Sequence, residues 1–288
     1  MTGRQPAHDD QRATCAADGT KTSSASSGGQ GASSADDVAR GAPCWVSLTT
    51  RDLAAAEKFY GSVLGWEFRS TTLGERFAVA VTDGRPLATI GAVAGDMQVA
   101  VGWTPFFAVA QADEATARIR ERSATVALGP VSFASGRAVL AADRDGAVFG
   151  VWDGRLPGGW QSWHDRGPVV VRLRTRDAFE AAIFYGGVLE WADEDDACSV
   201  AYDYEHAEVV VRNRGEVVAR ISSGAIGAAP DPTIRPHWAV HFAVDDVAAR
   251  AEAARALGGT VVGTGTGPIG PWADLRDPDG GLFTVFSR

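Results

Sequence analysis

The chain has 288 residues and a formal net charge of −9, with 36 acidic against 27 basic side chains. This acidic balance, without a cluster of Lys and Arg, argues against nucleic acid as a partner. The sequence contains neither the roughly 20 consecutive apolar residues of a membrane helix nor the apolar core of a signal peptide, so we expect no membrane partner and a cytoplasmic location. The three cysteines, Cys15, Cys44 and Cys198, follow no C-x-x-C pattern, which implies neither a disulfide framework nor a zinc site.

Residues 1–42 differ in composition from the rest of the chain. They are rich in Ser, Gly, Ala, Thr and Asp and contain almost no large apolar side chain. Such a segment cannot bury enough surface to offset the entropy lost on ordering. We therefore predict a disordered leader over residues 1–42.

The next segment alternates as a strand over residues 45–50 and continues into apolar residues at helical spacing, with Asp52 as N-cap and Gly65 as the end of the helix. Three short strands follow, and the same order of strand, helix and three strands starts again at Trp103. The predicted elements after the first helix are strands near 66–69, 76–81 and 87–92, a strand over 104–109, a helix over 112–122, and strands near 125, 137–142 and 148–152.

The chain then repeats itself. Residues 43–66 (PCWVSLTTRDLAAAEKFYGSVLGW) match residues 168–191 (PVVVRLRTRDAFEAAIFYGGVLEW) at a constant offset of 125 without a gap. Identical pairs include Thr50/Thr175, Arg51/Arg176, Asp52/Asp177, Tyr60/Tyr185 and Trp66/Trp191. Further on, Asp143-Arg-Asp145-Gly146 matches Asp277-Pro-Asp279-Gly280 at an offset of 134. Each half is thus predicted to be a pair of β-α-β-β-β modules, which gives domains over 43–154 and 168–288 joined by an aperiodic linker over 155–167.

The second half contains the same predicted elements as the first. They are a strand over 169–175, a helix over 178–189, strands near 200, 207–212 and 217–222, a strand over 237–244, a helix over 247–257 and strands to residue 286. Tyr202, Tyr204, His206 and Glu208 alternate, which predicts one strand face. Gly263-Thr-Gly265-Thr-Gly267 imitates a phosphate loop, but prolines follow where a helix would have to begin, so we predict a flexible lid-like loop.

Three patterns together resemble the vicinal oxygen chelate superfamily of glyoxalase I, bleomycin-resistance proteins and extradiol dioxygenases. They are the strand x-V-x-L-x-T-x-D, the helix ending F-Y-G-x-V-L-G-W, and the closing D-P-D-G-x-x-F-x-V. The chain is most similar to tandem two-domain actinobacterial members, some of which occur in polyketide antibiotic biosynthesis. The resemblance covers about Pro43 to the C terminus, and it implies an α+β fold of two glyoxalase-like domains. In each of them a pair of βαβββ modules forms a curved sheet around a cleft.

The resemblance also implies where a metal would bind. Catalytic members hold a divalent ion with His or Glu from the first strand of each module and from the last strand of the second. The matching positions here are Trp45, Thr104 and Gly150 in the first domain and Val170, Ala239 and Thr284 in the second. Indole, alkyl groups and glycine offer no ligand and threonine is a poor one, so we expect no metal and no cofactor.

Strand parity predicts which side chains face each cleft. In the first domain these are Trp45, Ser47, Phe106 and Trp152, with Val148 as a further candidate. Aromatic surface suits a flat hydrophobic ligand, although an aromatic core or a domain interface explains it equally well.

The second cleft is predicted to present Arg172, Arg174, His237, His241 and Phe286. His241 is the candidate acid/base or hydrogen-bond donor, Arg172 the candidate partner of an oxyanion, and His237 a further catalytic candidate. Phe286 and Arg174 are candidate substrate contacts. The competing interpretation places the histidines on backbone or carboxylate partners and the arginines in salt bridges at a domain seam.

Three functions remain open from the sequence. The first is a metal-independent isomerase, cyclase, lyase or oxidation-assisting protein of secondary metabolism, acting on an aromatic, polyketide-like small molecule. The second is a non-catalytic resistance protein that sequesters such a molecule. The third is a metal-dependent lyase or dioxygenase with relocated ligands, for instance His237 or His241 with Glu208 or His206. We expect a monomer or a homodimer in each case.

Overall fold

A computed structural model describes residues 40–156, 169–191, 198–204, 206–213, 215–267 and 270–287. Most of the predicted leader and of the predicted linker lies outside the described residues. Within the described ranges no helix has the length and apolarity needed to span a membrane.

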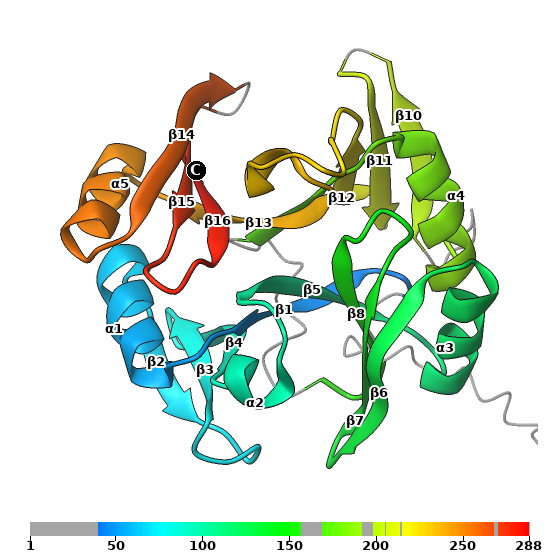
Figure 1. Cartoon of the computed structure of the whole chain (residues 1–288), viewed down its shortest axis with the longest axis horizontal. Helices are drawn as coiled ribbons and strands as arrows, with labels where there is room; N and C mark the ends of the chain where they lie inside the picture. The colour runs from blue at the N-terminus through cyan, green and yellow to red at the C-terminus, as the bar shows by residue number, and fades with distance from the viewer. Residues whose placement is uncertain are drawn as a thin grey trace, which may run out of the picture. The chain divides into compact units, whose positions relative to one another are not determined.

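The strands form two eight-stranded sheets of identical topology (Figure 1). The first has the order β2-β3-β4-β1-β5-β8-β7-β6. Its strands are β1 (Pro43–Thr49), β2 (Glu67–Ser70), β3 (Phe77–Thr82), β4 (Arg85–Gly91), β5 (Gly102–Ala108), β6 (Thr125–Phe133), β7 (Gly136–Ala142) and β8 (Val148–Gly154). Helices α1 (Leu53–Leu64) and α3 (Ala112–Glu121) follow β1 and β5, and a short α2 (Ala94–Met97), which was not predicted, precedes β5.

The second sheet has the order β10-β11-β12-β9-β13-β16-β15-β14, so each strand has a counterpart in the first. Its strands are β9 (Val169–Arg174), β10 (Ser199–Asp203), β11 (Glu208–Asn213), β12 (Glu216–Ser222), β13 (His237–Val244), β14 (Thr260–Gly267), β15 (Gly270–Arg276) and β16 (Leu282–Ser287). Helices α4 (Ala178–Leu189) and α5 (Val247–Ala256) follow β9 and β13, and a 3-10 turn spans Pro232–Ile234. This arrangement confirms the predicted α+β fold of paired βαβββ modules. We refer to the units built on the two sheets as the first and the second domain.

The helices begin and end where local chemistry requires. The Asp52 carboxylate accepts a hydrogen bond from the Ala55 amide at 3.0 Å, and Gly65 ends α1 with φ 73°. That left-handed conformation favours glycine, which has no Cβ. Asp177 caps α4 in the same way.

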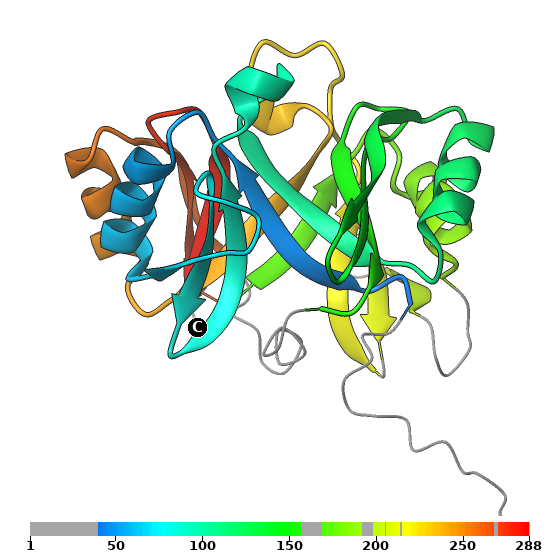
Figure 2. The same ribbon diagram turned by 90° about the horizontal axis from the view of Figure 1, so that it is seen from below.

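Helices of the two domains pack in pairs. In both ribbon views α1 lies beside α5 and α3 lies beside α4, on the outer sides of the sheets (Figures 1 and 2). The central strands β5 and β13 also contact each other. The two domains therefore share one apolar core.

The repeated tyrosine connects the domains. Tyr60 of α1 is fully buried and donates to Asp277 of the second domain at 2.8 Å. Tyr185 of α4 donates to Asp143 of the first domain at 2.9 Å. Each hydroxyl also accepts from a buried indole, that of Trp103 at 3.0 Å in one case and that of Trp238 at 2.9 Å in the other. The F-Y-G and D-x-D-G motifs of opposite domains thus meet directly.

The repeated Thr-Arg pair makes a second contact of the same kind. Asp279 accepts from the Thr50 hydroxyl and from the Arg51 amide, both at 2.7 Å. In the other direction Asp145 accepts from Thr175 at 2.9 Å and pairs with Arg176. The repeated motifs therefore form the domain interface and do not line the clefts.

Two sequence predictions were wrong in the second sheet. The glycine-rich segment Gly263–Gly267 belongs to strand β14, which pairs with β15. A Cβ on Gly265 would lie 2.6 Å from the Trp272 ring, so the glycine provides room for this indole on the neighbouring strand. Tyr202 and Glu208 do not share a strand, because β10 ends at Asp203 and β11 begins at Glu208.

Candidate ligand-binding site

Each domain has a cleft on its central strands, and residues alternate between the core and the cleft. On β13 every second residue from Trp238 is buried, while His237, Ala239 and His241 are half-buried. On β1 the half-buried residues are Trp45, Ser47 and Thr49. The alternation predicted from the sequence therefore matches the observed alternation of buried and half-buried residues on both strands.

The first cleft is a cavity of about 350 Å³. Its lining includes Trp45, Ser47, Phe106 and Trp152, the four residues proposed from the sequence. Val148, the further candidate, is exposed and is not among the lining residues. Phe133 was missed, because it follows an irregular register near Gly129-Pro130 in β6 where period two fails.

Aromatic rings form one wall of the first cleft. The ring centroids of Trp45 and Phe106 are 4.9 Å apart, those of Trp45 and Trp152 are 4.6 Å apart with edge-on geometry, and Phe133 follows at 6.0 Å from Trp152. Gly150 is the register partner of Phe106, and a Cβ there would lie 2.3 Å from the Phe106 ring. The ring thus covers the backbone position at which family members place their last metal ligand.

The first cleft lacks acid/base groups. Among the described residues that line it, none is Asp, Glu, His, Lys, Arg or Cys. Its polar groups are hydroxyls, including those of Ser47, Thr89 and Thr104. This lining can bind an apolar ring system and form hydrogen bonds to it, but it offers no side chain that titrates near neutral pH.

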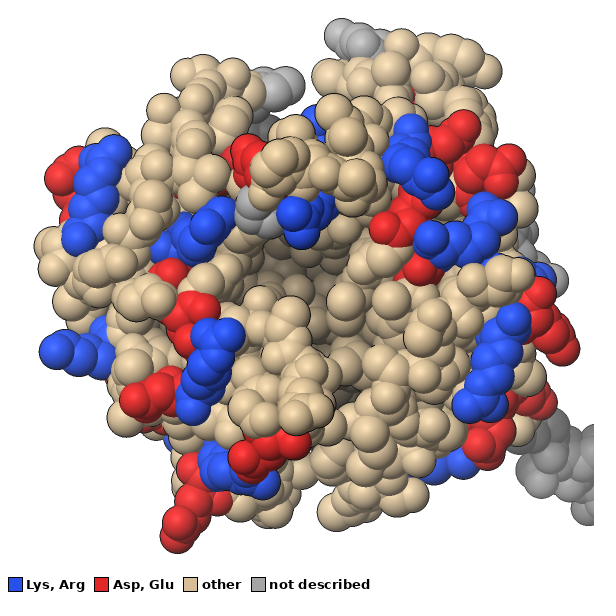
Figure 3. All heavy atoms as spheres, in the orientation of Figure 1, with Lys and Arg blue, Asp and Glu red and all other residues tan. Residues whose placement is uncertain are grey.

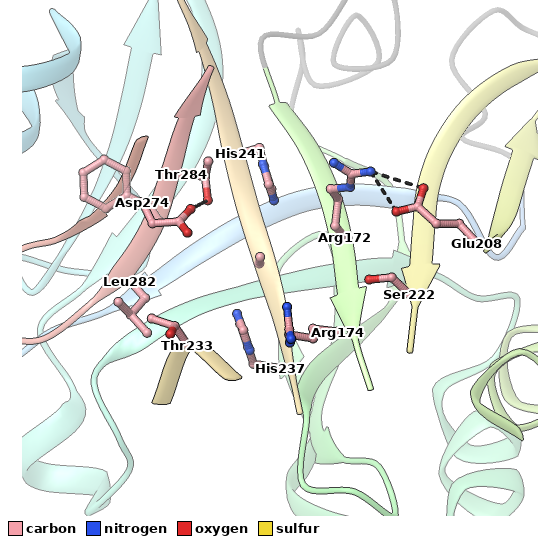
Figure 4. A pocket seen from close by; sticks show the side chains of 12 residues that line it. Arg172, Arg174, Glu208, Ser222, Thr233, His237, His241, Asp274, Leu282 and Thr284 are labelled. Atoms are coloured by element: carbon pink, nitrogen blue, oxygen red, sulfur yellow. Dashed lines mark hydrogen bonds and ion pairs between the residues drawn. The ribbon is translucent and has the colours of Figure 1, made fainter. Parts of the chain in front are cut away.

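The second cleft is smaller, about 230 Å³, and it is charged. It brings together Arg172, Arg174, His237 and His241, as proposed from the sequence, with Glu208 and Asp274 (Figure 4). Phe286 is not among its lining residues; its ring centroid lies 6.4 Å from that of His241.

Arg172 is already paired. Its Nη2 lies 3.0 and 3.2 Å from the two oxygens of Glu208, which also accepts from Arg220 at 3.1 Å. The ion pair lies within the second domain, across β9, β12 and β11, so the expected salt bridge at a domain seam is not what Arg172 forms. No local pattern in the sequence indicates Glu208 as its partner, since the pairing depends on the register of β11 in the sheet.

The two histidines are neutral at neutral pH. Burial lowers the pKa of His241 to about 3, assisted by the positive charge of Arg172 and by His237. Burial also lowers the pKa of His237, although its hydrogen bond to the Arg235 carbonyl, with Nδ1 2.7 Å from the oxygen, opposes the shift. A catalytic acid works best with a pKa near the operating pH, so His241 is better suited to hydrogen bonding than to proton donation.

The side chains do not fit a metal of the family type. In the second cleft Val170, His241 and Thr284 are neighbours in register, and Ala239 lies opposite Arg172. Thr284 uses its hydroxyl to donate to Asp274 at 2.6 Å. Within the described ranges no three His, Cys, Asp or Glu residues lie together in a way that could hold an ion.

The alternative metal ligands considered from the sequence, His237 or His241 with Glu208 or His206, do not form a metal site among the described residues either. His206 lies in the β10–β11 turn, with its Nδ1 3.0 Å from Asp203.

The two described cysteines, Cys44 and Cys198, are buried and form no disulfide, while Cys15 lies outside the described residues. Burial raises the pKa of Cys198 to about 12. Neither thiol is a reactive thiolate at neutral pH.

Paired βαβββ modules folded into eight-stranded sheets, each with a cleft on its central strands, define the glyoxalase class of proteins. Family models agree: a glyoxalase-like domain matches residues 169–286, and a bleomycin resistance protein-like N-terminal model matches residues 44–82. The chain belongs to the vicinal oxygen chelate superfamily, which contains the glyoxalases, bleomycin-resistance proteins and extradiol dioxygenases.

Two relatives align with this chain over nearly their whole length. The anthracycline biosynthesis protein DnrV of Streptomyces peucetius is 31% identical over 269 residues, which are 86% of this chain and 93% of that protein. A mycobacterial protein named as a candidate glyoxylase, CFP32 of Mycobacterium tuberculosis, is 28% identical over 258 residues, covering 85% and 94%.

Solved structures show the same fold at low identity. The Mn(II)-bound glyoxalase from Novosphingobium aromaticivorans superposes with a TM-score of 0.52 at 16% identity, covering 86% of this chain and 82% of that one. A catechol 2,3-dioxygenase superposes with a TM-score of 0.53 at 12% identity, covering 87% and 94%. At these identities the likeness extends to the fold alone.

Proposed function

We propose that this protein binds a flat, aromatic, polyketide-like small molecule of secondary metabolism in the first cleft, without a metal ion. The observation that supports this most is the lining of that cleft, which combines aromatic rings with hydroxyls and includes no ionisable group among its described residues. Buried apolar contact is worth about 25 cal/mol per Å², and ring–ring contacts add about 0.5–1.5 kcal/mol each. The relation to an anthracycline biosynthesis protein supports a polycyclic aromatic ligand.

The absence of a metal is part of the proposal and rests on donor chemistry. At the family's ligand positions the first cleft presents an indole, a threonine and a glycine whose backbone is covered by Phe106. None of these groups is a good ligand for Zn²⁺, Fe²⁺ or Mn²⁺. Binding through rings and hydroxyls requires no ion.

The proposal can be tested with a fluorescence titration. Emodin, a flat hydroxyanthraquinone, should quench the tryptophans in a saturable manner, whereas cholate, which is apolar but not flat, should bind at least tenfold more weakly. Ser47→Phe fills the first cleft and should weaken emodin binding at least tenfold. Ser222→Phe makes the same change in the second cleft and serves as the matched control. Equal affinity of both variants and the unchanged protein would refute the location.

Proton-transfer catalysis in the second cleft is the second candidate. It is favoured by one observation, the convergence of His237, His241, Asp274 and Arg172 on one small cavity. His241 would act there as a neutral hydrogen-bonding group that polarises a ligand oxygen, and the carboxylate of Asp274, whose pKa burial raises, would accept the proton. A product formed on long incubation from a phenolic ligand small enough for this cavity, such as 4-hydroxybenzoate, and lost in His241→Ala, would support catalysis; chemically unaltered ligand would leave binding or sequestration as the function.

A further inference from the structure

The two arginines of the second cleft differ in what they contact. Arg172 forms a double contact with Glu208, whereas Arg174 donates only from Nη2, to the Gly224 carbonyl at 3.1 Å. The Nε of Arg174 is buried and makes no hydrogen bond with any described residue. Within the described part of the chain no carboxylate forms an ion pair with Arg174. Its positive charge is therefore not neutralised by direct contact.

The carboxylates of the cleft are engaged elsewhere. Glu208 is shared by Arg172 and Arg220. Asp274 accepts from the Thr284 hydroxyl at 2.6 Å, and burial raises its pKa. Arg174 is half-buried, so water solvates its charge only in part, and an anionic ligand would supply the missing counter-charge.

His237 lies directly beside Arg174. The two are register partners on β13 and β9, and their side chains lie together at one end of the cleft (Figure 4). Because Nδ1 of His237 is 2.7 Å from the Arg235 carbonyl, Nδ1 must bear the proton. Nε2 of the neutral ring is then a hydrogen-bond acceptor, which requires a donor group on the ligand.

The size of the cavity limits the ligand. Its volume of about 230 Å³ lies below the roughly 300–1,000 Å³ of clefts that hold drug-sized molecules. The lining of the cleft also includes the apolar residues Ala239 and Leu282. A small organic anion with one hydroxyl group matches this combination of size, charge and hydrogen bonding.

We propose that the second cleft is a separate binding site for a small hydroxycarboxylate, whose carboxylate binds the guanidinium of Arg174 and whose hydroxyl donates to Nε2 of His237. This site goes beyond the function proposed for the first cleft and does not depend on it. Arginine suits the role because its planar fork can bind both oxygens of a carboxylate.

Calorimetric titration tests the site with salicylate, 3-hydroxybenzoate, 4-hydroxybenzoate and glycolate as probes. At least one should bind saturably at millimolar concentration, and the corresponding amide should bind at least tenfold more weakly. Arg174→Gln should weaken the binding of that probe at least tenfold. Arg212→Gln is the matched control, because Arg212 also donates to a glycine carbonyl, that of Gly215 at 2.9 Å, but lies exposed outside the cleft.

A second variant separates the hydroxyl from the carboxylate. His237→Phe should reduce the affinity of the hydroxycarboxylate to that of the analogue without the hydroxyl, and should leave the analogue itself unchanged. Equal thermal unfolding midpoints would show that the variants remain folded. The proposal is overturned if no probe binds, if the amides bind as tightly as the acids, or if Arg174→Gln binds as well as the unchanged protein. Emodin titration of the same variants reports on the first cleft alone, so failure at one site is distinguishable from failure at the other.

Discussion

The hydroxyl of Tyr60 should be worth several kcal/mol to the folded state, and Tyr60→Phe tests this. The side chain is fully buried, so water cannot replace what the hydroxyl provides. Without the hydroxyl, Asp277 no longer accepts its charge-assisted hydrogen bond from Tyr60, and the Trp103 N–H loses its acceptor. An unsatisfied buried group costs about 1–3 kcal/mol. Asp277 retains bonds from the backbone amides of Asp279, Gly280 and Gly281, so we expect a total loss of about 2–4 kcal/mol.

Urea unfolding followed by circular dichroism measures this loss. Tyr185→Phe should lose a similar amount, because its hydroxyl makes the equivalent two bonds at 2.9 Å each. Tyr204→Phe is the control, since Tyr204 is 87% exposed and should change stability by less than about 0.5 kcal/mol. A loss below about 0.5 kcal/mol for Tyr60→Phe would contradict the reasoning, because it would mean that the buried contact between the domains contributes nothing net.

Two further changes follow from the interface and the first cleft. The hydrogen bond and charge of Arg176 lower the pKa of Asp145 below its usual 3.8, so the stabilisation is present above that pH and is lost as pH falls through the lower folded value. Arg176→Ala should therefore flatten this part of the acid unfolding curve, and an unchanged curve would exclude the contribution. Gly150→Val should displace the Phe106 ring into the first cleft and lower the free energy of unfolding by about 1–3 kcal/mol. The displaced ring should also weaken emodin binding at least tenfold. Unaltered emodin affinity in a fluorescence titration would show that the position of this ring does not shape the cleft.

Local signals predicted most elements of the fold. Asp177 at an N-cap and apolar residues at helical spacing placed α4 at residues 178–189, and the structure has the same limits. Period two placed His237 and His241 on one side of β13, because that alternation is a property of the strand itself. These features depend on residues close in sequence, which a single chain reveals.

Features that depend on contacts between distant residues were not predictable. Glu208 meets Arg172 only through the register of two strands, and the charge of Arg172 is neutralised as a result. Gly265 suggested a loop, although its role is to make room for Trp272 on the next strand. The repeat revealed that Tyr60 had a counterpart, but not that its hydroxyl reaches a carboxylate more than 200 residues away, at Asp277.

The exchanged contacts between the two domains bear on which parts of the two halves can vary independently. Tyr60 binds an aspartate of the other domain, and Tyr185 does the same in return, as the identical subunits of a two-fold homodimer would. A mutation in either motif would therefore weaken a contact made by the opposite domain. A mutation in the lining of one cleft breaks none of these reciprocal contacts. The two halves are thus alike at the interface and differ in the clefts, one of which is aromatic and the other charged. On the face shown in Figure 3 arginines and lysines lie beside acidic side chains and do not gather in one patch.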